Sequence, residues 1–150
     1  VQTCALPILS KSSALVVNAG TATTIDLLGS NGVHYGGWIL PGLELMQKSL
    51  ESSTAQLPLA IRNESKLSFG TSTNQAIISG CDAAQIGAIG HAIAVAKEIN
   101  QNVERIWLDG GNAKILANEI EQLSRTNSIR TEVSEGLVLR GLWAWLVEKL

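Results

Sequence analysis

The stretch ALVVNAGTATTID, residues 14–26, decides the fold. Its apolar run over 14–17 enters a turn at Asn18-Ala19-Gly20, which is typical of a buried strand. A second strand, rich in threonine, is predicted over 22–28. A third is predicted over 33–40, after an Asn-Gly pair that favours a hairpin. These segments predict an antiparallel meander of three strands.

The rest of the chain alternates helical and strand patterns. Helices are predicted over 43–50, 73–99, 112–123 and 135–149, and Ser134 is the expected N-cap of the last helix. Strands are predicted over 105–108 and 129–133, and a polar loop over 52–70. Three antiparallel strands followed by alternating helices and strands predict an α/β fold, a mixed sheet with helices on both faces. This is the order of a ribonuclease-H-like half domain.

Composition excludes several classes of protein. The chain has 150 residues, of which 45% are hydrophobic and 16% charged, enough for one domain with a core. A net charge of −2 gives no basic footprint for nucleic acid. No uninterrupted apolar run reaches the roughly 18 residues of a membrane helix. We therefore expect a cytoplasmic domain that contacts neither nucleic acid nor membrane.

Cysteine and histidine are too sparse for a structural metal site or a disulfide framework. Cys4 and Cys81 are far apart in sequence, and His34 and His91 are isolated. We expect Cys81 to be a buried thiol on a helix. The four tryptophans are expected to pack in the core or at an interface rather than against a ligand: Trp38, Trp107, Trp143 and Trp145.

The first residues differ in character from the rest. The octapeptide VQTCALPI at 1–8 has no start methionine and no secretory pattern. Its back-translation resembles sequencing-adapter DNA, so residues 1–10 are expected to be a non-native leader on an N-terminally truncated chain. A genuine short strand or loop is the alternative.

Two glycine-containing segments indicate close approach of other groups. At Gly20 the backbone can come near an anion, and the turn amides and the Thr21 hydroxyl can donate hydrogen bonds to phosphate. A plain hairpin is the alternative there. In the helix over 73–99, Gly80, Gly87 and Gly90 each cost about 1 kcal/mol relative to alanine. That cost is expected where another helix, from this chain or a second subunit, packs closely.

Five motifs together resemble those of type III pantothenate kinases. NAGTATTID at 18–26 resembles that family's DxGTAxTxD phosphate-binding motif, and GGWILPG at 36–42 its GGxIxPG segment. The other three follow in the family's order: GTST at 70–73 resembles GxNT, DGGNA at 109–113 resembles GGxA, and GLVLRGL at 136–142 resembles LxLxGL. Each motif alone is weak. Their common order makes residues 11–150 similar to the C-terminal lobe of that family.

The resemblance implies a fold, an activity and partners. The family belongs to the sugar-kinase, heat-shock and actin superfamily, in which two ribonuclease-H-like domains enclose ATP. It implies ATP-dependent phosphorylation of pantothenate to 4′-phosphopantothenate, the first step of coenzyme A biosynthesis, by positioning and charge stabilisation. The cofactors implied are Mg²⁺ with ATP and a monovalent cation, K⁺ or NH₄⁺. The implied assembly is a homodimer whose pantothenate pocket is completed across the interface.

Site residues follow from the same resemblance. Gly20 and Thr21 match the ATP-phosphate turn, and Gly110 and Gly111 match the adenosine turn, for which a simple strand-to-helix turn is the alternative. Thr73 matches the pantothenate-contacting threonine, with an N-cap as its structural alternative. Asp26 matches the motif's second aspartate, which is expected to orient the turn, cap it, or reach metal-bound water.

Two departures from the family pattern stand out. Asn18 occupies the position of a K⁺-coordinating aspartate, and its uncharged amide predicts weak or absent K⁺ binding. The family's upstream DxGN and GxDR segments, the latter carrying the general base, are absent, so no catalytic residue is assigned and the chain alone is expected to be inactive. The alternatives are a non-catalytic transcription accessory homologue and another nucleotide-binding member, such as a sugar kinase.

Overall fold

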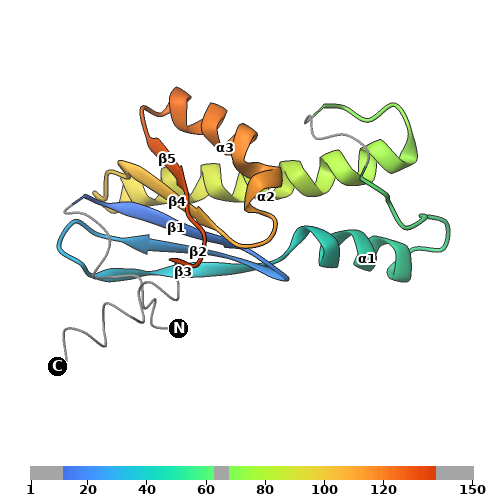
Figure 1. Ribbon diagram of the computed structural model, residues 1–150, viewed down its shortest axis with the longest axis horizontal. Coiled ribbons are helices and arrows are strands. Elements are labelled where there is room, and N and C mark those ends of the chain that lie inside the picture. Colours follow the sequence, from blue (N-terminus) through green and yellow to red (C-terminus); the bar gives the residue numbers. More distant parts are fainter. Residues whose placement is uncertain (1–11, 63–67, 138–150) are drawn as a thin grey trace.

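A computed structural model describes residues 12–62 and 68–137 of the chain. Five strands form one sheet in the order β3-β2-β1-β4-β5 (Figure 1). Their bounds are β1 Ala14–Ala19, β2 Ala22–Leu28, β3 His34–Pro41, β4 Arg105–Asp109 and β5 Arg130–Val133. The first three pair antiparallel, whereas β4 runs parallel to β1 and β5 parallel to β4. The predicted meander and mixed sheet are confirmed.

The central strand explains why the apolar run at 14–17 is continuous. Leu15 and Val17 belong to the main core, whereas Val16 packs on the opposite face with Leu28 and Leu137. A strand covered on both faces has no solvent side, so its sequence shows no alternation. The run therefore places β1 in the middle of the sheet.

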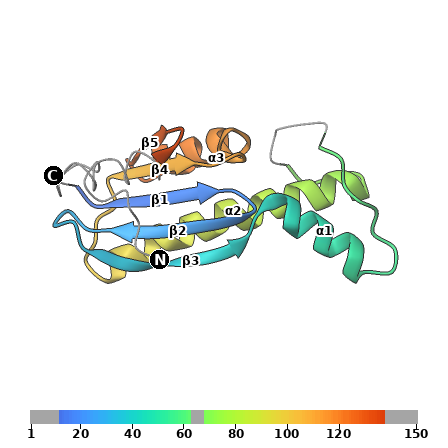
Figure 2. The same cartoon turned by 60° about the horizontal axis from the view of Figure 1, so that its bottom comes forward.

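Within the described residues, three helices accompany the sheet: α1 Leu43–Ser53, α2 Thr73–Glu98 and α3 Ala113–Thr126. In Figure 2, α2 and α3 lie on the same face, and α2 continues past the strands to run beside α1. The main core lies between this face and these helices, and includes Leu15, Ile25, Ile89, Ile106, Leu108, Leu116 and Ile120. The projecting α1 and the first half of α2 form a second structural region beyond the sheet.

The helix predicted over 135–149 falls mostly outside the described residues, so its packing on the second face stays a prediction. Its predicted start is wrong, because residues 135 and 136 are not helical and Gly136 has φ of 72°. The backbone N–H of Ser134 donates to the Leu108 carbonyl at 2.8 Å, which prolongs the edge of the sheet. Ser134 is therefore not the N-cap of a helix that begins at Glu135.

The N-cap of α2 also differs from the expectation by one residue. Ser72 has extended backbone angles, and its hydroxyl accepts from the Gln75 N–H at 3.3 Å. Thr73 is the first helical residue, so the structural alternative offered for it, an N-cap, is wrong. Its hydroxyl is not committed to capping this helix.

Of the three helical glycines, one has the predicted helix neighbour within this chain. A Cβ on Gly90 would lie 3.6 Å from Leu123 of α3. A Cβ on Gly80 or Gly87 would meet nothing within 4 Å among the described residues. Close helix packing is therefore confirmed at Gly90, and the other two glycines face open space.

By length and composition alone, α2 could cross a membrane, since an 18-residue window in it has mean hydropathy 1.2. The core helix of a soluble protein passes the same test. Here the later part of α2 packs on the sheet through Ile89 and Ala92, and the helix also buries Asp82 and Gln85. These contacts indicate a core helix, and the window carries polar residues rather than an uninterrupted apolar run.

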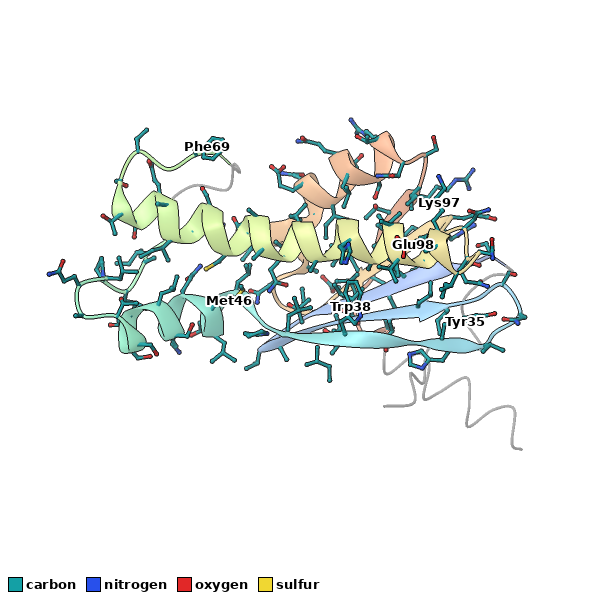
Figure 3. All side chains as sticks on the ribbon, turned by 180° about the vertical axis from the view of Figure 1, so that it is seen from behind. Tyr35, Trp38, Met46, Phe69, Lys97 and Glu98 are labelled. Atoms are coloured by element: carbon teal, nitrogen blue, oxygen red, sulfur yellow. The ribbon has the colours of Figure 1, made fainter. Side chains whose placement is uncertain are left out.

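Trp107 packs as predicted, whereas Trp38 is 37% exposed. Trp38 of β3 stacks on His91 of α2 with ring centroids 5.6 Å apart (Figure 3). Trp107 packs against the smaller cluster on the other face of the sheet. Trp143 and Trp145 lie outside the described residues.

Cys81 is the buried thiol that the sequence predicted, with 3% of its surface exposed. Burial raises its pKa, the nearby Asp82 carboxylate raises it further, and Arg62 opposes both. Because only the thiolate is nucleophilic, we expect iodoacetamide at pH 8 to alkylate Cys81 on the order of tenfold more slowly in the folded chain than in urea. Peptide mass spectrometry measures this, and equal rates in both states would contradict it.

Candidate functional site

Two turns that are about 90 residues apart in sequence lie in contact at one edge of the sheet. Asn18 and Asp109 are register partners on the parallel strands β1 and β4, so both strands end together. The Asn112 N–H donates to the Ala19 carbonyl at 2.9 Å, and its side-chain amide donates to the Gly20 carbonyl at 3.3 Å. The segments predicted to bind phosphate and adenosine are therefore neighbours.

The contact between the turns depends on Gly110. Its φ of 99° is a conformation that side-chain-bearing residues rarely adopt, and an added Cβ would lie 2.6 Å from both the Ala19 carbonyl oxygen and Asn18 Oδ1. Gly111 differs, because its Cβ position faces open space and the residue is exposed. The turn thus has one packed glycine and one open glycine.

Asp109, which sequence reasoning did not single out, holds this turn together. Its Oδ1 accepts from the N–H groups of Gly110 at 2.7 Å and Gly136 at 3.3 Å, and its Oδ2 accepts from Leu137 at 2.6 Å. Hydrogen bonds to a charged acceptor are roughly twice as strong as neutral ones. Asp109 therefore fastens the start of the fifth motif, at 136–137, to the fourth.

The second motif meets the first at Gly42. The Gly42 N–H donates to the Thr21 carbonyl at 2.9 Å, and a Cβ there would lie 2.1 Å from the Gly20 carbonyl oxygen. Gly42 also precedes α1, whose first backbone bond runs from the Met46 N–H to the Gly42 carbonyl. The start of α1 is therefore packed directly on the Gly20-Thr21 turn.

The hydrogen-bond donors of that turn are partly committed. The Gly20 N–H donates to the Ala22 carbonyl at 3.1 Å, so it is engaged within the turn. Thr21 is exposed, and its hydroxyl forms no hydrogen bond within the described part of the chain. Thr21 is thus the side-chain donor that this turn presents to solvent.

Asp26 does not lie at the turn, which corrects the expectation that it orients or caps it. It is 7% exposed and is paired in register with Val16 and Gly37, inside β2 rather than at the turn. His34 Nε2 donates to its Oδ1 at 2.8 Å. The histidine considered isolated is therefore the partner of this buried carboxylate.

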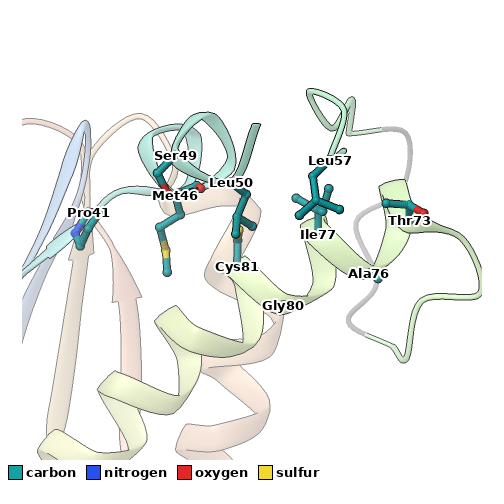
Figure 4. Close-up of a pocket in the computed structure, with 10 residues that line it drawn as sticks. All are labelled: Pro41, Met46, Ser49, Leu50, Leu57, Thr73, Ala76, Ile77, Gly80 and Cys81. Carbon is teal, nitrogen blue, oxygen red and sulfur yellow. Dashed lines mark hydrogen bonds between the residues drawn. The ribbon is translucent and has the colours of Figure 1, made fainter. Parts of the chain in front are cut away.

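A cavity of about 480 Å³ opens between α1 and α2 (Figure 4). Its lining is mainly apolar, with hydroxyls from Ser49 and Thr73: Pro41, Met46, Ser49, Leu50, Leu57, Thr73, Ala76, Ile77, Gly80 and Cys81. Met46 lies between the two helices in Figure 3. Since Pro41 lines the cavity and Gly42 packs on the turn, the cavity adjoins the predicted phosphate site.

The loop that contributes Leu57 to this cavity is tied to α2. Arg62 makes two hydrogen bonds to the buried Asp82, at 2.6 and 2.9 Å. Asn74 brackets Ile61, accepting from its N–H at 2.7 Å and donating to its carbonyl at 2.9 Å. Sequence reasoning described this segment only as a polar loop, because pairing between a loop and a distant helix turn leaves no periodic signal.

No group of three or more histidine, cysteine, aspartate or glutamate side chains is arranged to hold a metal ion in residues 12–62 and 68–137. At the predicted cation position, Asn18 offers a neutral amide oxygen beside the Gly110 turn. The carboxylate oxygens of its register neighbour Asp109 already accept hydrogen bonds from backbone N–H groups. These residues fit a weakly held cation better than a strongly charged site.

Comparison with known proteins assigns the family. The family model described as type III pantothenate kinase matches residues 3–95. The chain belongs to the type III pantothenate kinase family. The match begins within the predicted leader at 1–10, so the foreign origin of that segment stays a prediction.

Curated type III pantothenate kinases match most of this chain. The relative from Colwellia psychrerythraea is 35% identical over 122 residues, which cover 81% of this chain and 49% of the relative. The relative from Herminiimonas arsenicoxydans is 42% identical over 130 residues, with coverages of 85% and 48%. The chain thus spans about half the length of the curated relatives that it matches.

Solved structures confirm the fold class. A Baf family transcriptional activator from Campylobacter jejuni aligns with a TM-score of 0.64 at 23% identity, covering 97% of this chain and 62% of that one. The Alp12 filament structure aligns with a TM-score of 0.59 at 14% identity, covering 98% and 52%. The chain has the ribonuclease-H-like fold that its element order predicted.

Proposed function

We propose that this chain is the C-terminal lobe of a kinase that transfers a phosphoryl group from ATP to pantothenate, yielding 4′-phosphopantothenate at the first step of coenzyme A biosynthesis. The observation that carries the proposal is the contact between the Gly20-Thr21 and Gly110-Gly111 turns, with the cavity containing Thr73 beside them. Family membership supports the same chemistry.

Each site residue has a role consistent with its surroundings. Thr21, exposed at the end of β1, would donate its hydroxyl to ATP phosphate oxygens, and Gly20 keeps the turn compact. Gly110 and Gly111 would line the adenosine side, where the open Gly111 permits close approach. Thr73 would bind pantothenate through a hydroxyl free of capping. Mg²⁺ would accompany the ATP phosphates and supply charge stabilisation during transfer.

Phosphoryl transfer also needs a base near the acceptor hydroxyl, and we propose that another lobe supplies it. The chain alone should therefore be inactive. We also propose that the complete enzyme is cytoplasmic. The test is ADP release by the complete gene product, assayed with pantothenate, without an acceptor, and with a sugar in its place. Release that requires pantothenate supports the proposal. Release that requires the sugar favours the sugar-kinase alternative.

The non-catalytic alternative rests on Asn18, where the family's charged cation ligand is missing. A complete gene product that folds, binds ATP and releases no ADP with any acceptor would favour this transcription accessory role.

A homodimer is the proposed assembly, and the exposed face of α2 supports it. Gly80 and Gly87 leave open space where a neighbouring helix can approach. A second copy of the chain would occupy that space and complete the pantothenate pocket. Analytical ultracentrifugation of the complete gene product tests the assembly, and a monomer at micromolar concentration would contradict it.

Asn18→Asp is expected to make stability depend on K⁺. The new carboxylate would lie in register beside Asp109, and like charges directly opposite each other destabilise a sheet. A bound K⁺ would relieve that repulsion. Urea unfolding in KCl and in tetramethylammonium chloride at equal ionic strength measures the effect. A variant with the same stability in both salts would contradict a cation site here.

A further inference from the structure

Gln85 is a polar side chain buried at the junction of β3, α1 and α2. It is 1% exposed, and its Nε2 donates to the Pro41 carbonyl at 2.8 Å and lies 3.3 Å from Met46 Sδ. Because a carbonyl oxygen only accepts hydrogen bonds, the amide nitrogen must face Pro41. This orientation leaves Oε1 buried without a hydrogen-bond partner in the described residues.

The carbonyl that Gln85 holds is the link between two parts of the proposed site. Pro41 lines the cavity between α1 and α2, and the next residue, Gly42, donates its N–H to the Thr21 carbonyl at 2.9 Å. Gly42 is packed so tightly on the turn that its Cβ position lies 2.1 Å from the Gly20 carbonyl oxygen. A shift of Pro41 therefore has to move the phosphate turn, the cavity wall, or both.

We infer that Gln85 is a positioning residue that fixes the proposed phosphate turn relative to the acceptor cavity, through Pro41 and Gly42. The expected effect of Gln85 on catalysis rests on the proposed function. Its expected effect on the position of Pro41 and Gly42 rests on the geometry alone. Gln85 does not itself line the cavity, but it contacts two residues that do, Pro41 and Met46, so it acts on the site through them.

The energetics favour positioning over stabilisation as the role of this amide. The Gln85 amide donates one hydrogen bond to the Pro41 carbonyl and a weak one to the Met46 sulfur, while its Oε1 is a buried acceptor without a partner in the described residues. The gain and the cost are of similar size and opposite sign. An apolar side chain of the same length would remove the orphaned oxygen, but it would also take the side-chain donor away from the Pro41 carbonyl, so the gain and the loss offset each other. Gln85→Met should therefore leave overall stability unchanged while releasing Pro41.

The test compares Gln85→Met with Ile89→Met, a matched change one turn along the buried face of α2, in this chain. We expect the urea midpoint of Gln85→Met to equal or exceed that of the parent. We expect amide hydrogen exchange at Gly42 to accelerate on the order of tenfold, because its bond to Thr21 is no longer braced. Ile89→Met should leave Gly42 exchange unchanged. A lowered midpoint for Gln85→Met, or unaltered Gly42 exchange, would overturn the inference.

Kinetics of the complete gene product then separate this inference from the proposed function. With Gln85→Met, we expect a fall in kcat of about tenfold with a smaller change in the KM for ATP, because the two substrates are misaligned rather than unbound. A parent protein without pantothenate kinase activity would refute the proposed function while leaving the exchange result to decide the role of Gln85. An active parent with an unaffected variant would overturn the positioning role.

Discussion

Gly42→Ala should damage the fold and the proposed phosphate turn together. The added Cβ would lie 2.1 Å from the Gly20 carbonyl oxygen and 2.6 Å from the Thr21 carbonyl oxygen. Both obstacles are backbone atoms, so no flexible side chain can yield. Overpacking of this kind costs about 3 kcal/mol, since the start of α1 or the turn has to move. Urea unfolding of the chain measures the loss.

Gly80→Ala is the matched control for that substitution. It adds the same methyl group where nothing lies within 4 Å, so it should be neutral or stabilise α2 by up to about 1 kcal/mol. If Gly42→Ala and Gly80→Ala have the same stability, the tight packing of α1 on the turn is wrong.

Gly110→Ala is expected to have an equally large effect by two routes. A side chain at φ of 99° is strained by about 1–3 kcal/mol, and the Cβ would lie 2.6 Å from the Ala19 carbonyl oxygen. Together these should lower the free energy of unfolding by about 3 kcal/mol or more and separate the two turns. ATP binding, followed by isothermal titration calorimetry, should weaken by at least about tenfold for the same reason.

Gly111→Ala is the control that shows whether the loss in Gly110→Ala comes from the geometry of the turn or from any substitution in it. The Cβ position of Gly111 is open, so Gly111→Ala should change stability by less than about 1 kcal/mol. It should still reduce ATP affinity, if the nucleotide approaches the backbone there. Equal destabilisation by the two substitutions would contradict the assignment of one packed and one open glycine.

Much of the fold was predictable from local sequence signals. The continuous apolar run at 14–17 indicated a strand buried on both faces, and β1 is the central strand. The Asn31-Gly32 pair indicated the hairpin before β3, and Gly32 has φ of 78°. The element order then fixed the mixed sheet. Element ends were less accurate: α1 and α3 each extend three residues further than the periodicity predicted.

The contact between the two turns was only partly predictable. The resemblance assigned both turns to ATP, but only the structure shows that β1 and β4 are parallel neighbours whose ends meet. The hydrogen bonds of Asp109 could not be predicted from the sequence. Its carboxylate oxygens accept from backbone N–H groups at 136–137, which only folding brings close to it. Since every residue except proline has a backbone N–H group, the sequence does not reveal which backbone group a side chain will bind.

The partners of Asp26 and Gln85 were also not predictable from the sequence. Motif matching predicted that Asp26 orients or caps the phosphate turn, but its carboxylate lies within β2 and pairs with His34 instead. Gln85 lies in a helix of small and apolar residues whose pattern suggested only close packing. Its partner, the Pro41 carbonyl, is 44 residues earlier in the chain. Side-chain roles that depend on one distant backbone atom required the structure.

The central claim is that the turns at 18–21 and 109–112 form one nucleotide site. The most direct measurement is titration of the isotopically labelled chain with Mg²⁺-ATP, followed by backbone amide NMR. The predicted result is concerted shifts at Gly20, Thr21, Gly110 and Gly111, with none at Gly32, which lies beyond the opposite end of β2. Shifts confined to one turn, or saturable binding that moves neither, would contradict the account.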